Sequence, residues 1–124
     1  MIKGIKYESA VENWLKSKGN AIIARNFRTR HGEIDIIAAD DEYIMFIEVK
    51  AKKSDDFGAP REVVDLRKQQ KICKTAAIYL AENLHDLQPR FDVAEVYINH
   101  ENDVISRINY IKNAFDFIEL GANF

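Results

Sequence analysis

Two carboxylates and one lysine occupy neighbouring segments that both have the composition of strands. Asp35 lies in EIDIIAAD, and Glu48 and Lys50 lie in FIEVK, at the end of the next apolar segment. If the turn between the segments is centred on Asp41 and Glu42, Asp35 faces Glu48 across an antiparallel pair, with Cβ atoms roughly 4.5–5.5 Å apart. Lys50 then shares their face, because side chains alternate along a strand.

This arrangement predicts a site for Mg²⁺ (or Mn²⁺). Like charges placed opposite each other destabilise a sheet, whereas a divalent cation between them reverses the sign of the interaction. Mg²⁺ is usually held by one or two carboxylates together with phosphate and water, and Asp35, Glu48 and the Val49 carbonyl would supply three oxygens. Lys50, next to the ion, would orient an attacking water or stabilise charge on a phosphate oxygen.

The metal site depends on the register of the hairpin. A turn with an odd number of residues would place Asp35 and Glu48 on opposite faces of the sheet. In the register that brings them together, Ile37 faces Phe46 on the same side of the sheet. The opposite face is then wholly apolar and consists of Ile34, Ile36, Ile47 and Val49. The alternative to a metal site is an ordinary salt bridge at the end of a sheet.

A fourth candidate is Glu8, in the first predicted helix. Between about residues 5 and 17, Val11, Trp14 and Leu15 recur at helical spacing, and Gly19 follows as a stop signal. Glu8 lies on the same helical face as Val11 and Leu15, the side that should meet the sheet. A carboxylate there is costly unless it is paired or bound to a metal. The alternative is an ordinary carboxylate near a helix N-terminus.

The positive charges are grouped, although the chain as a whole is not basic. The net charge is −2, with 18 Lys and Arg against 20 Asp and Glu, which by itself predicts no polyanion as partner. Basic side chains gather in RNFRTRH, KAKK and RKQQKICK. We expect a local basic rim that contacts nucleic acid, with Arg28, Arg30 and Lys52 as candidates. A solvated surface is the alternative.

The remaining patterns predict the elements that position these residues. Strands are expected at residues 21–29, 33–40, 43–51, 89–99 and 104–111, and a second helix between Arg61 and Leu84. Its expected apolar stripe consists of Leu66, Cys73, Ala77, Leu80 and Leu84. The order helix, three-strand meander, helix, two strands predicts an α/β fold with a mixed sheet of about five strands. The second helix would make a parallel, right-handed crossover. NAFDFIEL, residues 113–120, receives no assignment.

The bulk properties indicate a single domain spanning residues 1–124. A single cysteine, Cys73, and the lack of a signal-peptide pattern favour the cytoplasm. No apolar run approaches the roughly 20 residues needed to cross a bilayer, so no membrane association is expected. The tail AFDFIELGANF would cap the core or form a contact in a homodimer.

The ordered series of motifs resembles a known group of proteins. An acidic residue on the first helix, an Asp on a strand and Glu-x-Lys on the next strand are similar to the PD-(D/E)xK nuclease superfamily, especially the archaeal Holliday-junction resolvases. The blocks YESAVENWL, RNFRTRHGEIDIIA, FIEVKAK, RKQQKICKTAAIYL and RFDVAEV resemble the bacterial YraN-like family, uncharacterised protein family 0102. This second resemblance covers nearly the whole chain.

The resemblance implies a restriction-endonuclease-like fold and a Mg²⁺-dependent endonuclease acting on DNA, including branched DNA. In that scheme Asp35 and Glu48 bind the metal, Lys50 serves catalysis and Glu8 stands at the position of the first acidic residue. Lys68 matches a lysine of the second-helix block and would contact phosphate. The chain departs from the family pattern at Tyr7, where glycine is usual, and at Ala51-Lys52, where Thr-Arg is common. A binding module for nucleic acid or a protein partner, without catalysis, is the alternative.

Overall fold

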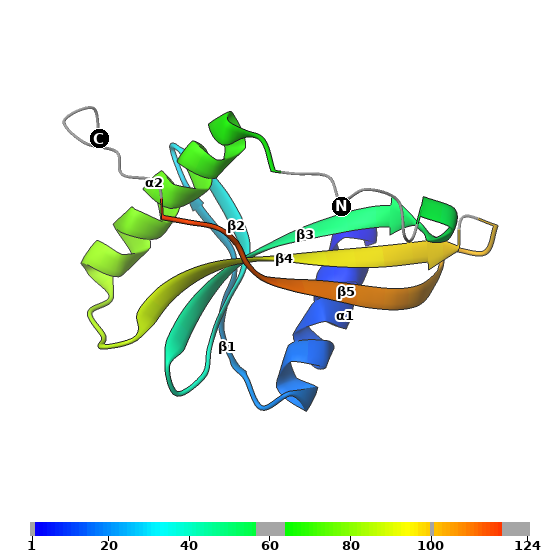
Figure 1. The fold of residues 1–124 in the computed structure, drawn as a ribbon, viewed down its shortest axis with the longest axis horizontal. Helices are drawn as coiled ribbons and strands as arrows, with labels where there is room; N and C mark the ends of the chain where they lie inside the picture. The colour runs from blue at the N-terminus through cyan, green and yellow to red at the C-terminus, as the bar shows by residue number, and fades with distance from the viewer. Residues whose placement is uncertain (1, 57–63, 100, 118–124) are drawn as a thin grey trace.

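In the computed structural model the sheet has a helix on each of its two faces (Figure 1). Residues 2–56, 64–99 and 101–117 are described. The elements follow in the order α1 (Ile2–Ser17), β1 (Ala21–Thr29), β2 (Gly32–Ala39), β3 (Tyr43–Lys53), η1 (Ser54–Asp56), α2 (Leu66–Glu82), β4 (Gln88–Asn99) and β5 (Val104–Phe115). Among these elements, no helix is long and apolar enough to cross a membrane.

The sheet is mixed, as predicted, and its strands are ordered β1-β2-β3-β4-β5. β3 and β4 run parallel, with α2 in the connection between them, and every other neighbouring pair is antiparallel. The segment that received no assignment begins inside β5, which extends to Phe115. Phe115 is buried and stacks on Phe91, with 5.0 Å between ring centroids, so this part of the tail packs in the core. Residues 118–124 lie outside the described part.

Alternate residues of β3 pack against different helices. Met45 and Ile47 belong to the apolar cluster that includes Val11 and Leu15 of α1. Ile44 and Phe46 belong to the cluster that includes residues of α2. The two-residue period of a strand therefore separates two cores, one on each face of the sheet.

The predicted stripe of α2 is partly wrong. Leu66 and Leu84 are 61% and 93% exposed, because Leu66 opens the helix and Leu84 follows its last residue, Glu82. Asp65 caps the N-terminus by accepting a hydrogen bond from Lys68 N at 2.9 Å, and the predicted start at Arg61 lies outside the described residues. Cys73 is buried as predicted, and Ile72, Thr75, Ala76 and Tyr79 form the rest of the buried face.

The turn between β2 and β3 fixes the register that the sequence predicts. Asp40 N donates to Tyr43 O at 3.0 Å, and the Asp40 carboxylate accepts from the backbone of Glu42 and Tyr43 at 2.8 and 2.7 Å. Ile37 consequently pairs with Phe46. The even-numbered turn thus confirms the predicted register as far as Ile36 and Ile47, but the predicted direct pairing of Asp35 with Glu48 is not part of the ladder.

One prediction about the faces of β2 is wrong. Ile34 packs in the cluster of α2, whereas Ile36 packs in the cluster of α1, although a regular strand would put both on one face. The irregularity coincides with Asn26 on β1, which has a positive φ of 53°. Asn26 lies between Arg25 and Phe27, which pair with Ile36 and Ile34, and so stands beside Asp35. The sheet is therefore distorted at Asp35 itself.

A buried ion pair within β4 is hydrogen-bonded to β5. Asp92 is fully buried and accepts two hydrogen bonds from the Arg90 guanidinium, both at 2.9 Å. Tyr110 Oη and Asn113 N, from β5, donate to the same carboxylate at 2.6 and 2.9 Å. Every carboxylate oxygen of Asp92 therefore has two partners, which is the condition under which a buried charge is tolerated.

Replacing Asp92 by Ala is expected to lower the free energy of unfolding by about 3–5 kcal/mol, because it leaves the Arg90 guanidinium largely buried without its counter-charge. Urea denaturation followed by circular dichroism measures the change. Asp86→Ala, at an exposed position between α2 and β4, is the control and should change stability by less than about 0.5 kcal/mol. Equal, small effects for both variants would contradict this account of the network.

Candidate functional site

The candidate site lies where β2 and β3 separate. Their ladder runs from Ala39 and Ile44 to Ile36 and Ile47, and in the described residues it goes no further. Beyond it, the Asp35 carboxylate accepts a hydrogen bond from Val49 N at 2.8 Å. The Asp35 side chain thus replaces a backbone carbonyl of β2 as the acceptor for Val49 N. β2 and β3 separate at this point and form a fork with Asp35 at its base.

The Val49 carbonyl faces the same fork. In an antiparallel ladder the N–H and C=O of one residue point to the same neighbouring strand. Tyr43 O is bonded to Asp40 at the start of β3, and Val49 N is bonded to Asp35 near its end. Because the direction alternates along the strand, the carbonyls of both residues point toward β2. The fork therefore offers a peptide oxygen beside its carboxylates.

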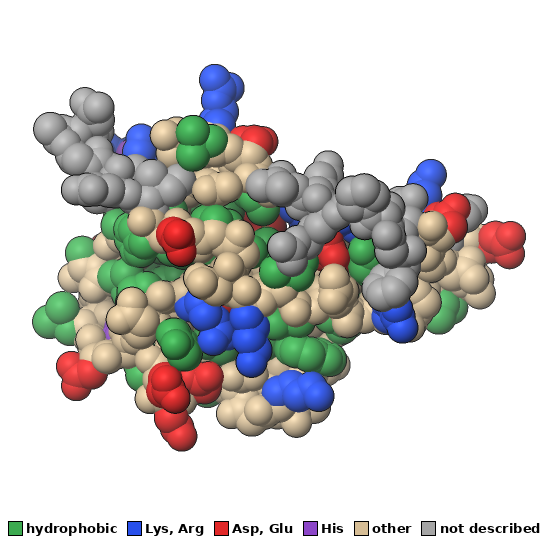
Figure 2. Space-filling view, viewed as in Figure 1, with side chains coloured by type: hydrophobic (Ala, Val, Ile, Leu, Met, Phe, Trp, Pro, Cys, Tyr) green, Lys and Arg blue, Asp and Glu red, His purple; other side chains and the backbone are tan. Residues whose placement is uncertain are grey.

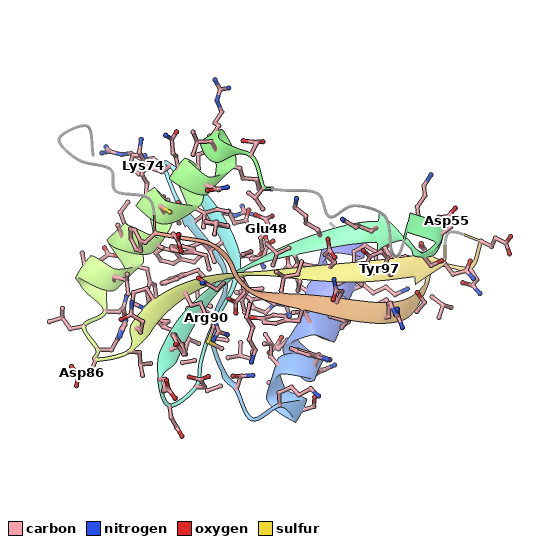
Figure 3. The ribbon with its side chains drawn as sticks, viewed as in Figure 1. Glu48, Asp55, Lys74, Asp86, Arg90 and Tyr97 are labelled. Carbon is pink, nitrogen blue, oxygen red and sulfur yellow. The ribbon has the colours of Figure 1, made fainter. Side chains whose placement is uncertain are left out.

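A cavity of about 600 Å³ opens at the fork. Asp35 and Glu48 both line it, as do Val49 and, from α1, Glu8. Glu48 lies below α2 in the view of Figure 3, on the strand that passes beneath the start of that helix. The structure therefore brings together the three carboxylates that the sequence singled out, from α1, β2 and β3.

The Asp35 carboxyl group has a strongly raised pKa. Burial is the largest cause, and the negative charges of Glu48, Glu8 and Glu33 raise the pKa further. The hydrogen bond from Val49 N acts in the opposite direction, and the result is a pKa of about 7 against an ordinary value of 3.8. Burial, and after it the neighbouring negative charges, therefore disfavour the ionised form of the Asp35 carboxyl group.

Glu48 is neutralised by a lysine of α2. Lys68 Nζ lies 3.0 Å from Glu48 Oε1. The two partners differ in burial, because the Glu48 side chain is 13% exposed and that of Lys68 is 48% exposed. Lys68, which the resemblance assigns to phosphate binding, thus contacts a proposed metal ligand instead.

Glu8 is neutralised by an arginine of β1. Arg25 Nη2 lies 3.3 Å from Glu8 Oε1, and Arg25 Nη1 lies 3.0 Å from Glu12 Oε2. The guanidinium also donates to Ser9 Oγ and to Ile5 O. The sequence analysis did not place Arg25 in the site. Its signal was a charged residue directly after the apolar run AIIA in a predicted strand.

The two lysines of the EVKAK segment have different surroundings. Lys52 lines the cavity, and its Nζ lies 2.7 Å from Glu95 Oε2 on β4. Glu95 is buried and also accepts hydrogen bonds from Asn109 and Tyr97. Burial raises the pKa of Glu95, but these bonds outweigh it and leave the pKa below the ordinary value. Lys50 pairs in register with Glu95 and is half-buried, but it is absent from the described lining of the cavity.

The sequence analysis also missed Glu95. The signal that drew attention to FIEVK, an acid within an apolar strand, is repeated in FDVAEVYI and could have found it. Glu95 sits on the strand parallel to β3 and holds Lys52 at the cavity. Lys52, which lines the cavity, thus has a buried acidic partner on the neighbouring strand β4.

Neither Arg28 nor Arg30 is among the described residues that line this cavity, but Arg28 lines a second cavity of about 400 Å³ together with Glu8 and Asp35. Arg28 is exposed and its Nε lies 3.4 Å from Glu33 Oε2. Arg30, in the turn between β1 and β2, is exposed and donates from Nε to His31 Nε2 at 3.4 Å. On the face shown in Figure 2, the Lys and Arg side chains are spread over several elements and do not form one continuous patch.

The donor set suits a hard, oxygen-binding cation held by few protein ligands. Within the described residues, no three His, Cys, Asp or Glu side chains are close enough together to form a complete metal cage. Mg²⁺ rarely uses such cages and is commonly bound by one or two carboxylates, with waters and phosphate completing its shell. Asp35, Glu48 and the Val49 carbonyl match that pattern, and a cation beside Asp35 would offset the cost of burying its charge.

The fold and the site together define an α/β protein with paired carboxylates at a fork in a mixed sheet. The chain belongs to the uncharacterised protein family UPF0102, whose family model matches residues 7–96. It is 46% identical over 109 residues to a UPF0102 protein of Caldanaerobacter subterraneus subsp. tengcongensis, covering 87% of this chain and 89% of that protein. Similar relatives come from Clostridium acetobutylicum (48% identical, 87% and 88% covered) and Acetivibrio thermocellus (48%, 87% and 86%).

The raised pKa of Asp35 predicts a pH dependence of stability. Because the folded state binds the proton more tightly than the unfolded state, the stability of the protein should fall as pH rises from about 4 to about 7. Asp35→Asn keeps an oxygen for Val49 N, removes the charge and should abolish this component. At pH 8 we expect the variant to be more stable by on the order of 1–3 kcal/mol.

Chemical denaturation of both proteins between pH 4 and 8 measures the effect. Asp41→Asn, in the exposed turn between β2 and β3, serves as control for removing one negative charge. A stability difference between wild type and Asp35→Asn that stays constant across this range would contradict the raised pKa.

Proposed function

We propose that this protein is a Mg²⁺-dependent endonuclease that hydrolyses phosphodiester bonds in DNA, including branched or otherwise structured DNA. The observation that carries the proposal is the fork itself, where Asp35, Glu48 and the Val49 carbonyl meet at an open cavity. An arrangement that raises a carboxyl pKa to about 7 is costly for stability and is typical of sites with a functional use. The mixed sheet flanked by helices supports a restriction-endonuclease-like fold.

Each residue of the fork has a proposed role. Asp35, Glu48 and the Val49 carbonyl hold the cation, and Glu8 supports the site from α1 while it remains bound to Arg25. The bound ion would lower the pKa of a coordinated water and offset the charge on the phosphate oxygens. Lys50, immediately after Val49 on β3, would orient the water or stabilise the phosphate in the transition state.

The proposed contacts to DNA are few. Arg28, Arg30, Lys52 and Lys68 are the candidates, and all but Lys52 are exposed at the surface. The near-neutral net charge of −2 and the spread of basic side chains support a local rim and not a wide cationic surface. The logarithm of the binding constant should therefore fall with the logarithm of the salt concentration at a slope corresponding to a handful of phosphates.

Cleavage of DNA in the presence of Mg²⁺ or Mn²⁺ tests the proposal. Incubation with single-stranded, duplex, flap and four-way-junction DNA should give metal-dependent products with at least one substrate. Asp35→Ala should reduce the rate by at least about 100-fold, because it removes a ligand of the ion that activates the attacking water, whereas Asp41→Ala in the exposed turn should leave it unchanged. Full activity of a folded Asp35→Ala variant would overturn the assignment.

One observation favours a second candidate, a binding module for nucleic acid or a protein partner that does not cleave. Glu48 and Glu8 each have an internal cation, Lys68 and Arg25, so the site is partly neutralised without a metal. Binding of DNA with no products from any substrate, and with no response of the thermal unfolding temperature to Mg²⁺ or Mn²⁺, would favour this candidate, because an ion that binds the native state must stabilise it.

A further inference from the structure

The two internal cations of the site are held very differently. Arg25 contacts Glu8, Glu12, Ser9 Oγ and the Ile5 carbonyl, and its side chain is 27% exposed. Among the residues that the structure describes, Lys68 has one ion-pair contact, with Glu48, and its side chain is 48% exposed. Arg25 is therefore fixed by several contacts between α1 and β1. The side chain of Lys68 is about half exposed, so a change of its rotamer can move the ammonium away from Glu48.

Binding of a divalent cation at the fork requires that ammonium to move. An oxygen of Glu48 that coordinates Mg²⁺ faces a doubly charged ion, and a lysine ammonium 3.0 Å from the same carboxylate would then be repelled. The ion pair itself opposes the exchange only weakly, because partly exposed pairs contribute on the order of 0–1 kcal/mol. Lys68 is thus the replaceable counter-charge of Glu48.

We propose that Lys68 is a substrate-binding residue of this site, held on Glu48 without the metal and released to a phosphate of the nucleic acid when the metal binds. The inference rests on the proposed function. Mg²⁺ that is held by one or two carboxylates completes its shell with substrate phosphate, which brings a phosphate close to Glu48. The displaced ammonium leaves the Glu48 carboxylate and binds the nearby phosphate. Binding of the metal therefore increases the affinity for nucleic acid, and binding of nucleic acid increases the affinity for the metal.

The first measurement is the affinity for Mn²⁺ alone, by isothermal titration calorimetry of the whole protein. Lys68→Met should bind the ion roughly two- to fivefold more tightly than wild type, because the ion no longer displaces a salt bridge. Lys71→Met removes the same charge one turn further along α2 without removing the Glu48 ion pair, and should bind Mn²⁺ as wild type does. Lys68 is largely exposed, and a cooperative thermal transition confirms that its variant folds.

The second measurement is the affinity for a four-way-junction DNA, by fluorescence anisotropy, in EDTA and in Ca²⁺. In EDTA, Lys68→Met should bind the DNA as wild type does, because Lys68 is occupied by Glu48. In Ca²⁺ the variant should bind at least about threefold more weakly than wild type, since one phosphate contact is lost. If the role of Lys68 were merely structural, Lys68→Met would change the DNA affinity by the same factor in EDTA and in Ca²⁺.

The outcomes separate the two proposals. If wild type binds Mn²⁺ and Lys68→Met binds it with unchanged or weaker affinity, the role of Lys68 is wrong and the metal site stands. An equal loss of DNA affinity in EDTA and in Ca²⁺ also overturns the exchange. If wild type binds no Mn²⁺, the proposed nuclease function fails first, and the inference about Lys68 fails with it.

Discussion

The cost of burying neighbouring carboxylates at the fork, which repulsion between them increases, is the constraint on which the rest of the structure depends. Asp35 and Glu48 line one cavity with Glu8, in a partly buried place where negative charges repel strongly. Without a metal, the negative charge of each carboxylate is offset in a different way. Lys68 pairs with Glu48, Arg25 pairs with Glu8, and Asp35 takes up a proton near neutral pH. The chain thus supplies cations for Glu48 and Glu8, whereas the Asp35 carboxyl group is left with a raised pKa.

The fold supports this arrangement by interrupting its own sheet. Asp35 replaces a strand partner for Val49 N, so the hydrogen-bonding requirement of the backbone is met while the strands separate. The distortion at Asn26 sits beside it on β1 and shifts Ile34 and Ile36 to different cores. The parallel strand β4 then continues the sheet on the far side of β3, and its buried Glu95 fixes Lys52 at the cavity.

The sequence was sufficient for the parts of the fold that depend on local patterns. Turn chemistry at Asp40 and the alternation of apolar residues determined the register, and with it the meeting of Asp35 and Glu48. The exposed ends of the α2 stripe, Leu66 and Leu84, were missed because apolar periodicity does not mark where a helix stops touching the sheet. The distortion at Asn26 was missed because the alternation of apolar and polar residues along a strand does not show where the strand locally turns a side chain to the other face of the sheet.

The partners of the charged residues could not be predicted from sequence. Lys68 is 20 residues from Glu48 along the chain, and long flexible side chains reach whichever acid the packing of the helices brings near. The same holds for Arg25 and for Lys52, whose acid partners come from α1 and β4. Family membership identifies the relatives of the chain, but the chemistry of the fork follows from these contacts.

The most direct test of the proposed cation site at the fork is an NMR titration of the Asp35 side-chain carboxyl carbon, first without and then with saturating Mg²⁺. We expect a midpoint near pH 7 in the absence of the ion and a shift to well below that value in its presence, because the cation favours the ionised carboxylate. An ordinary midpoint near 3.8 that does not change with Mg²⁺ would contradict it.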